Sequence, residues 1–213
     1  KSEPELGARG VTAFLIEKGM KGFSIAQKLD KLGMRGSHTG ELVFENVEVP
    51  AENILGGLNQ GAKVLMSGLD YERAVLAAGP IGIMQSVMDN VIPYTHDRKQ
   101  FGQSIAEFQL VQAMLADSKA ELYAAECMVI DAARKRDEGR SVSTEASCCK
   151  MFASEMCGRV ADRAVQILGG AGYLSEYGIE RFYRDVRLFR LYEGTTQIQQ
   201  IIIGRNMVRE ARG

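Results

Sequence analysis

The hydrophobic pattern changes its period once along the chain. Between residues 10 and 50, apolar and polar residues alternate and glycines are frequent. A period of two is typical of strands that bury one face. We therefore expect short antiparallel strands, whose apolar positions are Val11, Ala13, Leu15, Leu42, Phe44, Val47 and Val49.

Glycines and a proline mark where these strands are expected to end. Proline cannot donate to a strand ladder, so Pro50 is expected to close the last strand. This much sheet is too little to bury both of its faces, which predicts that the rest of the sheet is missing from this chain or that the sheet packs on another chain. The expected turns are Lys18-Gly19, Lys21-Gly22 and Arg35-Gly36-Ser37.

From about Gly61 onward, apolar residues recur every three or four positions, which is the period of helices. The clearest helix is expected to stop near Gly139, because glycine commonly terminates helices. Its apolar face is expected to comprise Phe108, Val111, Leu115, Ser118, Leu122, Ala125, Val129 and Ala133.

Helical patterns recur through the rest of the chain. Long helices joined by short links favour an antiparallel bundle. The expected fold is mainly α, with part of an antiparallel β-domain over residues 1–58 and a C-terminal antiparallel helical bundle over residues 59–213. The remaining helical patterns cover residues 61–91, 143–168, 176–190 and 196–211.

The charges are nearly balanced, with 26 Lys and Arg against 27 Asp and Glu, so no field of one sign would attract nucleic acid or anionic lipid. The composition, 46% hydrophobic and 25% charged, is that of a soluble globular protein. Apolar runs fall short of the roughly 20 residues that cross a bilayer. We expect neither a nucleic-acid partner nor a membrane span, and the first ten residues do not resemble a signal or transit peptide.

The cysteines do not form a metal-binding pattern. None of the four belongs to a CxxC pair, and the chain has two histidines, His38 and His96, to complete a site. No metal site is predicted. Reduced structural thiols, in a reducing compartment, are the expected state of Cys127, Cys148, Cys149 and Cys157.

Single motifs are weak signals in this chain. It has no P-loop, no GxSxG, no HExxH and no complete GxGxxG. By itself, Gly169-Gly170-Ala171-Gly172 is typical of a turn between helices, and Arg98-Lys99-Gln100-Phe101-Gly102 of a solvated loop. Thr196 with Gln199 fits a capping box at the start of the last helix.

The order of several motifs along the chain is more specific than any one of them. These motifs are Leu69-Asp70-Tyr71-Glu72-Arg73, Asp97 to Ile105 with Phe108-Gln109, Gln166 to Tyr173, Arg184-Asp185 and Leu191 to Gln199. The series resembles the acyl-CoA dehydrogenase family at every step and over essentially the whole chain. The segment from Lys28 to Ser37 extends the resemblance into the strand region.

The resemblance implies a fold with an N-terminal helical domain, a middle β-domain and a C-terminal helical bundle. On that map the chain starts within the middle domain, and it is expected to be a fragment or a split subunit. Members of the family remove a proton next to the acyl-CoA thioester carbonyl while a hydride passes from the β-carbon to FAD. A fragment of this kind is expected to be inactive by itself.

The family's commonest base position corresponds to Glu193, whose backbone N–H is implied to be a donor to the thioester oxygen. The neighbouring Gly194 lets backbone and substrate approach closely. The isovaleryl-CoA branch keeps its base at the position of Glu72 instead, and this chain has both glutamates. We expect Glu193 to be the base and Glu72 to turn aside or pair with a cation.

The resemblance also implies residues that bind FAD and CoA. Arg98 and Gln109 would reach the pyrophosphate and adenosine portions of FAD. Asp70 and Arg73 would line the CoA passage, although a simple intrahelical ion pair remains an alternative for them. The other expected FAD contacts are Gln166, Gly169 and Gly170, at the cofactor of a neighbouring subunit, and Thr195 and Gln197.

Two other classes of function remain open. One is a non-catalytic helical subunit that binds flavin or CoA, and the other is an acyl-CoA oxidase or flavin monooxygenase on the same fold. For a dehydrogenase, the resemblance implies an electron-transfer flavoprotein as acceptor, a homotetramer, and the bacterial cytoplasm or mitochondrial matrix as location. The substrate is expected to be a short, medium or branched acyl-CoA.

Overall fold

The computed structural model describes residues 1–212, except for the side chain of Asp70. The chain divides into two compact units, Lys1–Leu69 and Asp70–Gly213. The division falls within helix α1 (Gly61–Leu76). The domain boundary expected near residue 58 stays a prediction.

The first unit contains short antiparallel strand pairs. Strand β2 (Phe23–Lys28) pairs with β3 (Gly40–Phe44), and Phe23 stacks on Phe44 with ring centroids 5.1 Å apart. Ile25, on β2, is 63% exposed, so this hairpin does not bury its apolar residues by itself. The other elements are the 3-10 helix Pro4–Gly10, β1 (Ala13–Phe14), which pairs with β4 (Ile54–Leu55), and the 3-10 helix Ala51–Asn53.

The prediction of a strand at Val47 and Val49 is wrong. Strand β3 stops at Phe44, and the ladder closes where Glu45 N donates to Gly22 O at 2.8 Å. Asn46 then has a φ of 51°, which turns the chain out of the extended conformation. Pro50 precedes a 3-10 helix rather than closing a strand. The three predicted turns are confirmed.

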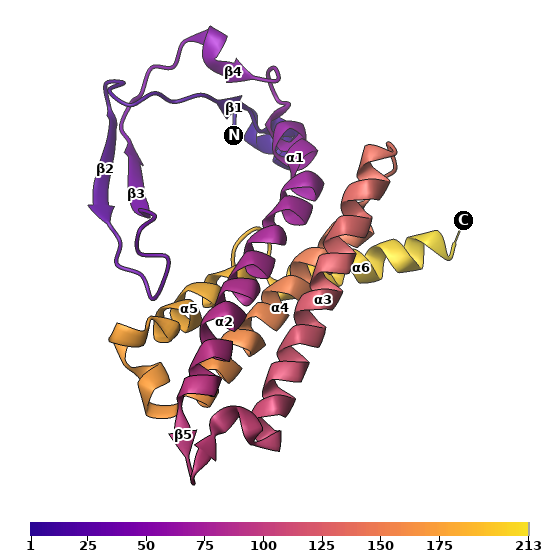
Figure 1. Ribbon diagram of the computed structural model, residues 1–213. Helices are drawn as coiled ribbons and strands as arrows, with labels where there is room; N and C mark the ends of the chain where they lie inside the picture. Colours follow the sequence, from indigo (N-terminus) through magenta and orange to yellow (C-terminus); the bar gives the residue numbers. More distant parts are fainter. Residues whose placement is uncertain (213) are drawn as a thin grey trace. The chain divides into compact units, whose positions relative to one another are not determined.

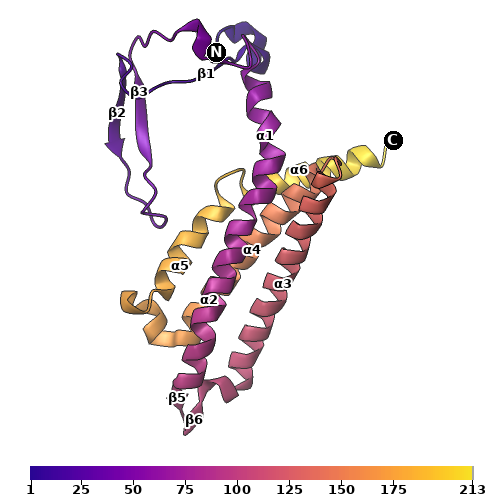
Figure 2. The ribbon, with the colours of Figure 1, turned by 45° about the horizontal axis from the view of Figure 1, so that its top comes forward.

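The second unit is helical, and α4 lies at its centre. Helices α2, α3 and α4 run side by side, with α5 and α6 packed on α4 (Figures 1 and 2). The mainly α fold class is confirmed. The helices are α2 (Ala78–Asp97), α3 (Gln109–Asp137), α4 (Ser143–Leu168), α5 (Ile179–Val186) and α6 (Thr196–Glu210).

Short elements join these helices. The hairpin of β5 (Lys99–Gln100) and β6 (Gln103–Ser104) reverses the chain between α2 and α3. Its central residues, Phe101 and Gly102, have φ values of 52° and 80°, the positive pair that a tight type I′ turn requires. The remaining connections contain the 3-10 helices Ile105–Glu107, Gly169–Tyr173, Ser175–Tyr177 and Arg187–Arg190.

The helix expected over residues 61–91 is two helices, and the second continues to Asp97. Pro80 gives the physical reason for the break at Ala77. Proline has no N–H, so Pro80 cannot donate to the carbonyl of Leu76 one turn earlier. The helices expected over 143–168 and 196–211 agree with the structure in position, and Gly139 follows the end of α3 with a φ of 77°. The helix expected over 176–190 is only partly correct, because α5 is short and has a 3-10 helix on either side.

The buried face of α3 differs from the expected stripe at its end. Ser118, Leu122 and Ala125 are buried as predicted, whereas Ala132 is buried in place of Ala133. Ala132 follows Ala125 by seven residues, which is almost two turns, so it returns to the same face. Ala133 follows by eight residues and lies about 80° beyond that face. The core residues that face one another across α2, α3 and α4 include Met84, Val87, Val91, Leu122, Ala146, Cys149, Ala153, Cys157, Val160 and Ala164.

The helical run Gly61–Asp97 is long and apolar enough to cross a membrane by length and composition, with a mean hydropathy of 1.3 in its best window. Core helices of soluble proteins pass the same test. Met84, Val87 and Val91 of α2 are almost completely buried within the second unit. The run is therefore weak evidence for a membrane span.

Two thiols in the core lead to a prediction about alkaline pH. Burial raises the pKa of Cys149 and of Cys157 from 9.0 to about 12. The folded protein thus keeps two protons that the unfolded chain releases, so stability is full below about pH 8.5 and falls as pH rises toward 12. Each thiol contributes a slope of up to about 1.4 kcal/mol per pH unit.

The measurement is urea unfolding of the protein and of its Cys149→Ala, Cys157→Ala double variant from pH 7.5 to pH 10. The free energy of unfolding of the variant should fall less over this range. Comparing the two proteins is necessary because Lys150, whose pKa is lowered by burial, changes stability in the opposite direction. Parallel curves for the two proteins would contradict the prediction.

Candidate active site

The expected base lies in a tight turn that leads into α6. Glu193 has an exposed side chain and a φ of 52°, and Gly194 has a φ of 85°. A β-carbon on Gly194 would lie 2.7 Å from the side-chain nitrogen of Gln199. Any larger residue at position 194 would therefore be strained and would push against Gln199.

Two buried side chains hold the carbonyl oxygens of this turn. Lys150 Nζ donates to the backbone oxygens of Phe189 at 2.7 Å and of Gly194 at 2.6 Å. Gln199 Nε2 donates to the backbone oxygens of Glu193 and Gly194, both at 3.1 Å. Both anchoring side chains have no exposed surface. The turn is thus tied to the middle of α4 and to α6.

The surroundings of Lys150 change its pKa in opposing directions. Burial lowers the pKa of Lys150, Glu193 and Glu155 oppose that effect, and Arg73 reinforces it. Arg73, on α1, is itself only 7% exposed. The structure therefore places two buried cations close to the turn that carries Glu193.

The start of α6 corrects one prediction. Thr195, not Thr196, is the N-cap, because its hydroxyl accepts from Ile198 N at 3.3 Å. The hydroxyl of Thr196 instead donates to Glu155 Oε1 at 2.6 Å, and Gln199 bonds the preceding carbonyls. The predicted capping box is therefore absent at this helix start, since both of its side chains are occupied elsewhere.

The other predicted residues of this region are on α1, which contains Asp70, Glu72 and Arg73, and on α6, which contains Gln197. The side chains of Glu72 and Gln197 are exposed. The side chain of Asp70 lies outside the described residues. The roles of Glu72, Asp70 and Arg73 stay predictions.

The remaining predicted cofactor residues gather at one end of the helical unit. Arg98 caps the C-terminus of α2, and Gln109 is the first residue of α3. Gln166 and the two glycines Gly169 and Gly170 lie at the C-terminus of α4. All five are exposed.

A direct contact joins these helix ends. Tyr94 Oη, on the last turn of α2, donates to the backbone oxygen of Leu168 at 3.5 Å. The helix ends that carry Arg98 and Gly169 therefore lie near each other. By contrast, Lys150, which holds the turn of Glu193, lies 18 residues before Leu168 on α4, about 27 Å at 1.5 Å per residue. The predicted site residues thus form two sets, one near Lys150 and one near the C-terminus of α4.

The residues at this end fit a cofactor with phosphate and polar groups. Arg98 offers a planar donor suited to phosphate oxygens, and Gln109 and Gln166 offer amides. Beyond the chain neighbours and the backbone of the same short helix, no described residue lies within 4 Å of a β-carbon built on Gly169 or Gly170. Space for a ligand therefore exists at both glycines.

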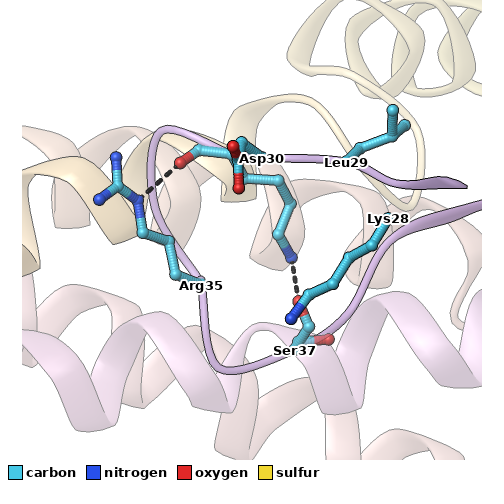
Figure 3. Close-up of a pocket in the computed structure, with 6 residues that line it drawn as sticks. Lys28, Leu29, Asp30, Arg35 and Ser37 are labelled. Carbon is cyan, nitrogen blue, oxygen red and sulfur yellow. Dashed lines mark hydrogen bonds between the residues drawn. The ribbon is translucent and has the colours of Figure 1, made fainter.

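The segment from Lys28 to Ser37 forms a compact loop between β2 and β3. It encloses a hollow of about 260 Å³, and Figure 3 shows Lys28, Asp30, Arg35 and Ser37 around it. Arg35 Nε donates to the backbone oxygen of Lys31 at 2.8 Å, and Lys31 Nζ donates to that of Ser37. These internal bonds explain why this motif is a defined loop rather than a continuation of the strands.

Sequence reasoning missed the two anchoring side chains, Lys150 and Gln199. A signal for the first exists in the sequence: Lys150 shares its helix face with Ala146, Ala153 and Cys157, at spacings of three, four and seven. A lone cation in a stripe of small apolar residues indicates a specific buried partner. Its partners are two backbone carbonyls about 40 residues away, which the sequence does not identify.

Comparison with known proteins identifies the family of this chain. The family model described as acyl-CoA dehydrogenase, C-terminal domain, matches residues 59–208. The mitochondrial isovaleryl-CoA dehydrogenase of Oryza sativa is 50% identical over 210 residues, which cover 99% of this chain and 51% of the relative. The caffeyl-CoA reductase-Etf complex subunit CarC of Acetobacterium woodii is 40% identical over 210 residues, covering 99% of this chain and 55% of that protein.

A solved structure shows the same fold. Butyryl-CoA dehydrogenase from Megasphaera elsdenii matches with a TM-score of 0.93 and 39% sequence identity, over 97% of this chain and 54% of that one. The chain spans about half the length of the curated relatives it matches. With the family model matching most of the chain, the protein belongs to the acyl-CoA dehydrogenase family, and residues 59–208 correspond to the C-terminal domain of that family.

Proposed function

We propose that the whole protein is an FAD-dependent acyl-CoA dehydrogenase, which forms an α,β double bond in a short, medium or branched acyl-CoA. The observation that carries this proposal is the exposed glutamate of the turn Tyr192 to Thr195, anchored from beneath by Lys150 and Gln199 in a chain of this family. A 50% identity to an isovaleryl-CoA dehydrogenase supports isovaleryl-CoA as the first substrate to test.

In this proposal Glu193 takes the proton from the carbon next to the thioester carbonyl. Its side chain is exposed within this chain and can reach a ligand that covers the turn. The backbone N–H of Glu193 would stabilise negative charge on the thioester oxygen. Gly194 would let the substrate approach the backbone, and Asp70 and Arg73 would line the CoA passage. FAD, when bound, supplies the hydride acceptor.

The two sets of cofactor residues support a site built from two copies of the chain. Thr195 and Gln197 would lie beside the FAD of their own subunit. Gln166, Gly169 and Gly170 lie far along α4 from Lys150 and would serve the FAD of a neighbouring subunit. Arg98 and Gln109 would reach the pyrophosphate and adenosine portions of FAD. This arrangement requires a homo-oligomer, and a tetramer is the proposed form.

The proposed electron acceptor is an electron-transfer flavoprotein. The name of the related subunit from Acetobacterium woodii places that protein in a complex with such a partner. The proposed location is the mitochondrial matrix or the bacterial cytoplasm, since similar proteins are described as mitochondrial or come from bacteria.

The test uses the full-length protein with bound FAD. Mixing it without oxygen with a series of straight and branched acyl-CoAs should bleach the flavin, and an electron-transfer flavoprotein should reoxidise it. Binding of acyl-CoA with no bleaching for any chain would favour a non-catalytic subunit. Rapid stoichiometric peroxide formation in air would favour an oxidase.

A further inference from the structure

Lys150 is a buried cation whose two described hydrogen bonds both go to backbone carbonyls. It has no exposed surface and comes from the buried face of α4. Its Nζ bonds the oxygens of Phe189 and Gly194, which stand on either side of the turn that carries Glu193. Burying a charged amine is costly unless it is satisfied by such bonds, so the contact is a specific one.

Gln199 adds a second anchor from α6. Its amide nitrogen bonds the oxygens of Glu193 and Gly194, so the Gly194 oxygen accepts from both anchors. The amide of Gln199, like Lys150, is completely buried. Together the two side chains draw the carbonyls of two successive peptide groups into the protein.

The direction of these carbonyls decides where the other backbone groups point. In a trans peptide the N–H is opposite to the C=O. Because buried side chains bond the oxygens of Glu193 and Gly194, the N–H groups of Gly194 and Thr195 point away from these anchors. The positive φ of Glu193 is an uncommon conformation for a residue with a side chain, and such conformations persist where the surroundings hold them.

We propose that Lys150, assisted by Gln199, is a positioning residue for the base. It fixes the peptide groups on either side of Gly194, and through them it fixes the direction of the Glu193 carboxylate. This inference rests on the proposed function, because Glu193 must be the base. Lys150 does not touch the substrate in this role, and it affects the rate of proton abstraction rather than acyl-CoA binding.

The test compares Lys150→Met with wild type in the full-length holoenzyme. Methionine keeps much of the length of the lysine side chain and removes the donor. Because a misplaced reacting group slows chemistry, the limiting rate of flavin reduction should fall roughly 10- to 100-fold. The acyl-CoA Kd, taken from the concentration dependence of the same rate, should stay within about threefold.

A matched control is Leu122→Ala, which creates a defect in the buried face of α3 without touching the turn. Its folded, FAD-containing form should reduce flavin at the wild-type limiting rate. If Lys150→Met folds poorly, Gln199→Met tests the same turn and should lower the limiting rate, again with Kd nearly unchanged. A wild-type limiting rate in folded Lys150→Met, or in Gln199→Met if that is the variant measured, would overturn the inference.

The double variant with Glu193→Gln separates positioning from a general structural role. Once the base is gone, its position no longer matters, so Lys150→Met should lower the remaining rate by less than about threefold. A full additional loss would show that Lys150 acts elsewhere and would overturn the inference. If Glu193→Gln alone kept the wild-type rate, the base assignment of the proposed function would fail and the inference with it, an outcome distinct from the failure of Lys150→Met.

Discussion

Replacing Glu193 by glutamine in the full-length protein is expected to lower the rate of flavin reduction by acyl-CoA about 10²- to 10⁴-fold, the usual contribution of a general base. Glutamine keeps the size and the backbone conformation of the residue but cannot accept a proton. The anchors of the turn hold carbonyl oxygens, not the carboxylate, so the turn should keep its shape. Rapid mixing without oxygen, with absorbance of the oxidised flavin as the signal, measures the effect.

Glu72→Gln is the matched control for this experiment. It makes the same change at the other candidate glutamate, which lies exposed on α1. We expect a much smaller loss, because Glu72 is not needed for proton removal in the proposed mechanism. The reverse result, with reduction abolished in Glu72→Gln and retained in Glu193→Gln, would assign the base to Glu72, as in the isovaleryl-CoA branch that the sequence resembles.

Two inactive variants are expected to restore activity when they assemble together. Gly170→Leu should fold, because no described residue beyond its chain neighbours and the backbone of its own helix comes within 4 Å of the new β-carbon. Its side chain should nevertheless block the proposed cofactor site of a neighbouring subunit. Glu193→Gln removes the base of its own subunit. In a mixed dimer, one site contains both substitutions. The other site contains an unchanged Glu193 from one subunit and an unchanged Gly170 from the other.

The measurement is the activity of mixed oligomers, obtained by coexpressing the two variants with different tags and purifying over both. Activity per subunit should rise from near zero in each parent to about half that of wild type in the mixed dimer, because one of its two sites is intact. Failure of well-assembled mixed oligomers to gain activity would show that both sets of residues serve the FAD of the same chain.

Much of the helical unit could be predicted from the sequence, because its helices have a regular period and clear ends. The stripe through Ser118, Leu122 and Ala125 has the spacing of one helix face, and Gly139 follows the end of α3. The break at Ala77 was missed, since the effect of Pro80 depends on whether the chain is already helical one turn earlier. The strand at Val47 and Val49 was wrong because two alternating positions do not specify a partner.

For the candidate site, the sequence by itself determined the family and indicated the residues that are proposed to have the relevant chemistry. The segment from Leu191 to Gln199 and the glycines from Gly169 resemble their counterparts through local features, such as residue type and spacing. The relation of these segments to one another is not local. That Arg98 and Gly169 lie near the same end of the unit, apart from the turn of Glu193, follows from how α2 and α4 pack.

Only the tertiary structure decided how the turn of Glu193 is held. A capping box was expected at Thr196, but Thr195 is the N-cap. The hydroxyl of Thr196 instead donates to the carboxylate of Glu155 on α4. Lys150 bonds the carbonyl of Gly194, 44 residues later in the chain. Every residue has a backbone carbonyl, whatever its side chain. A sequence can therefore show that a buried lysine needs acceptors, but not which carbonyls they are. The packing of α4 against the chain before α6 makes that choice.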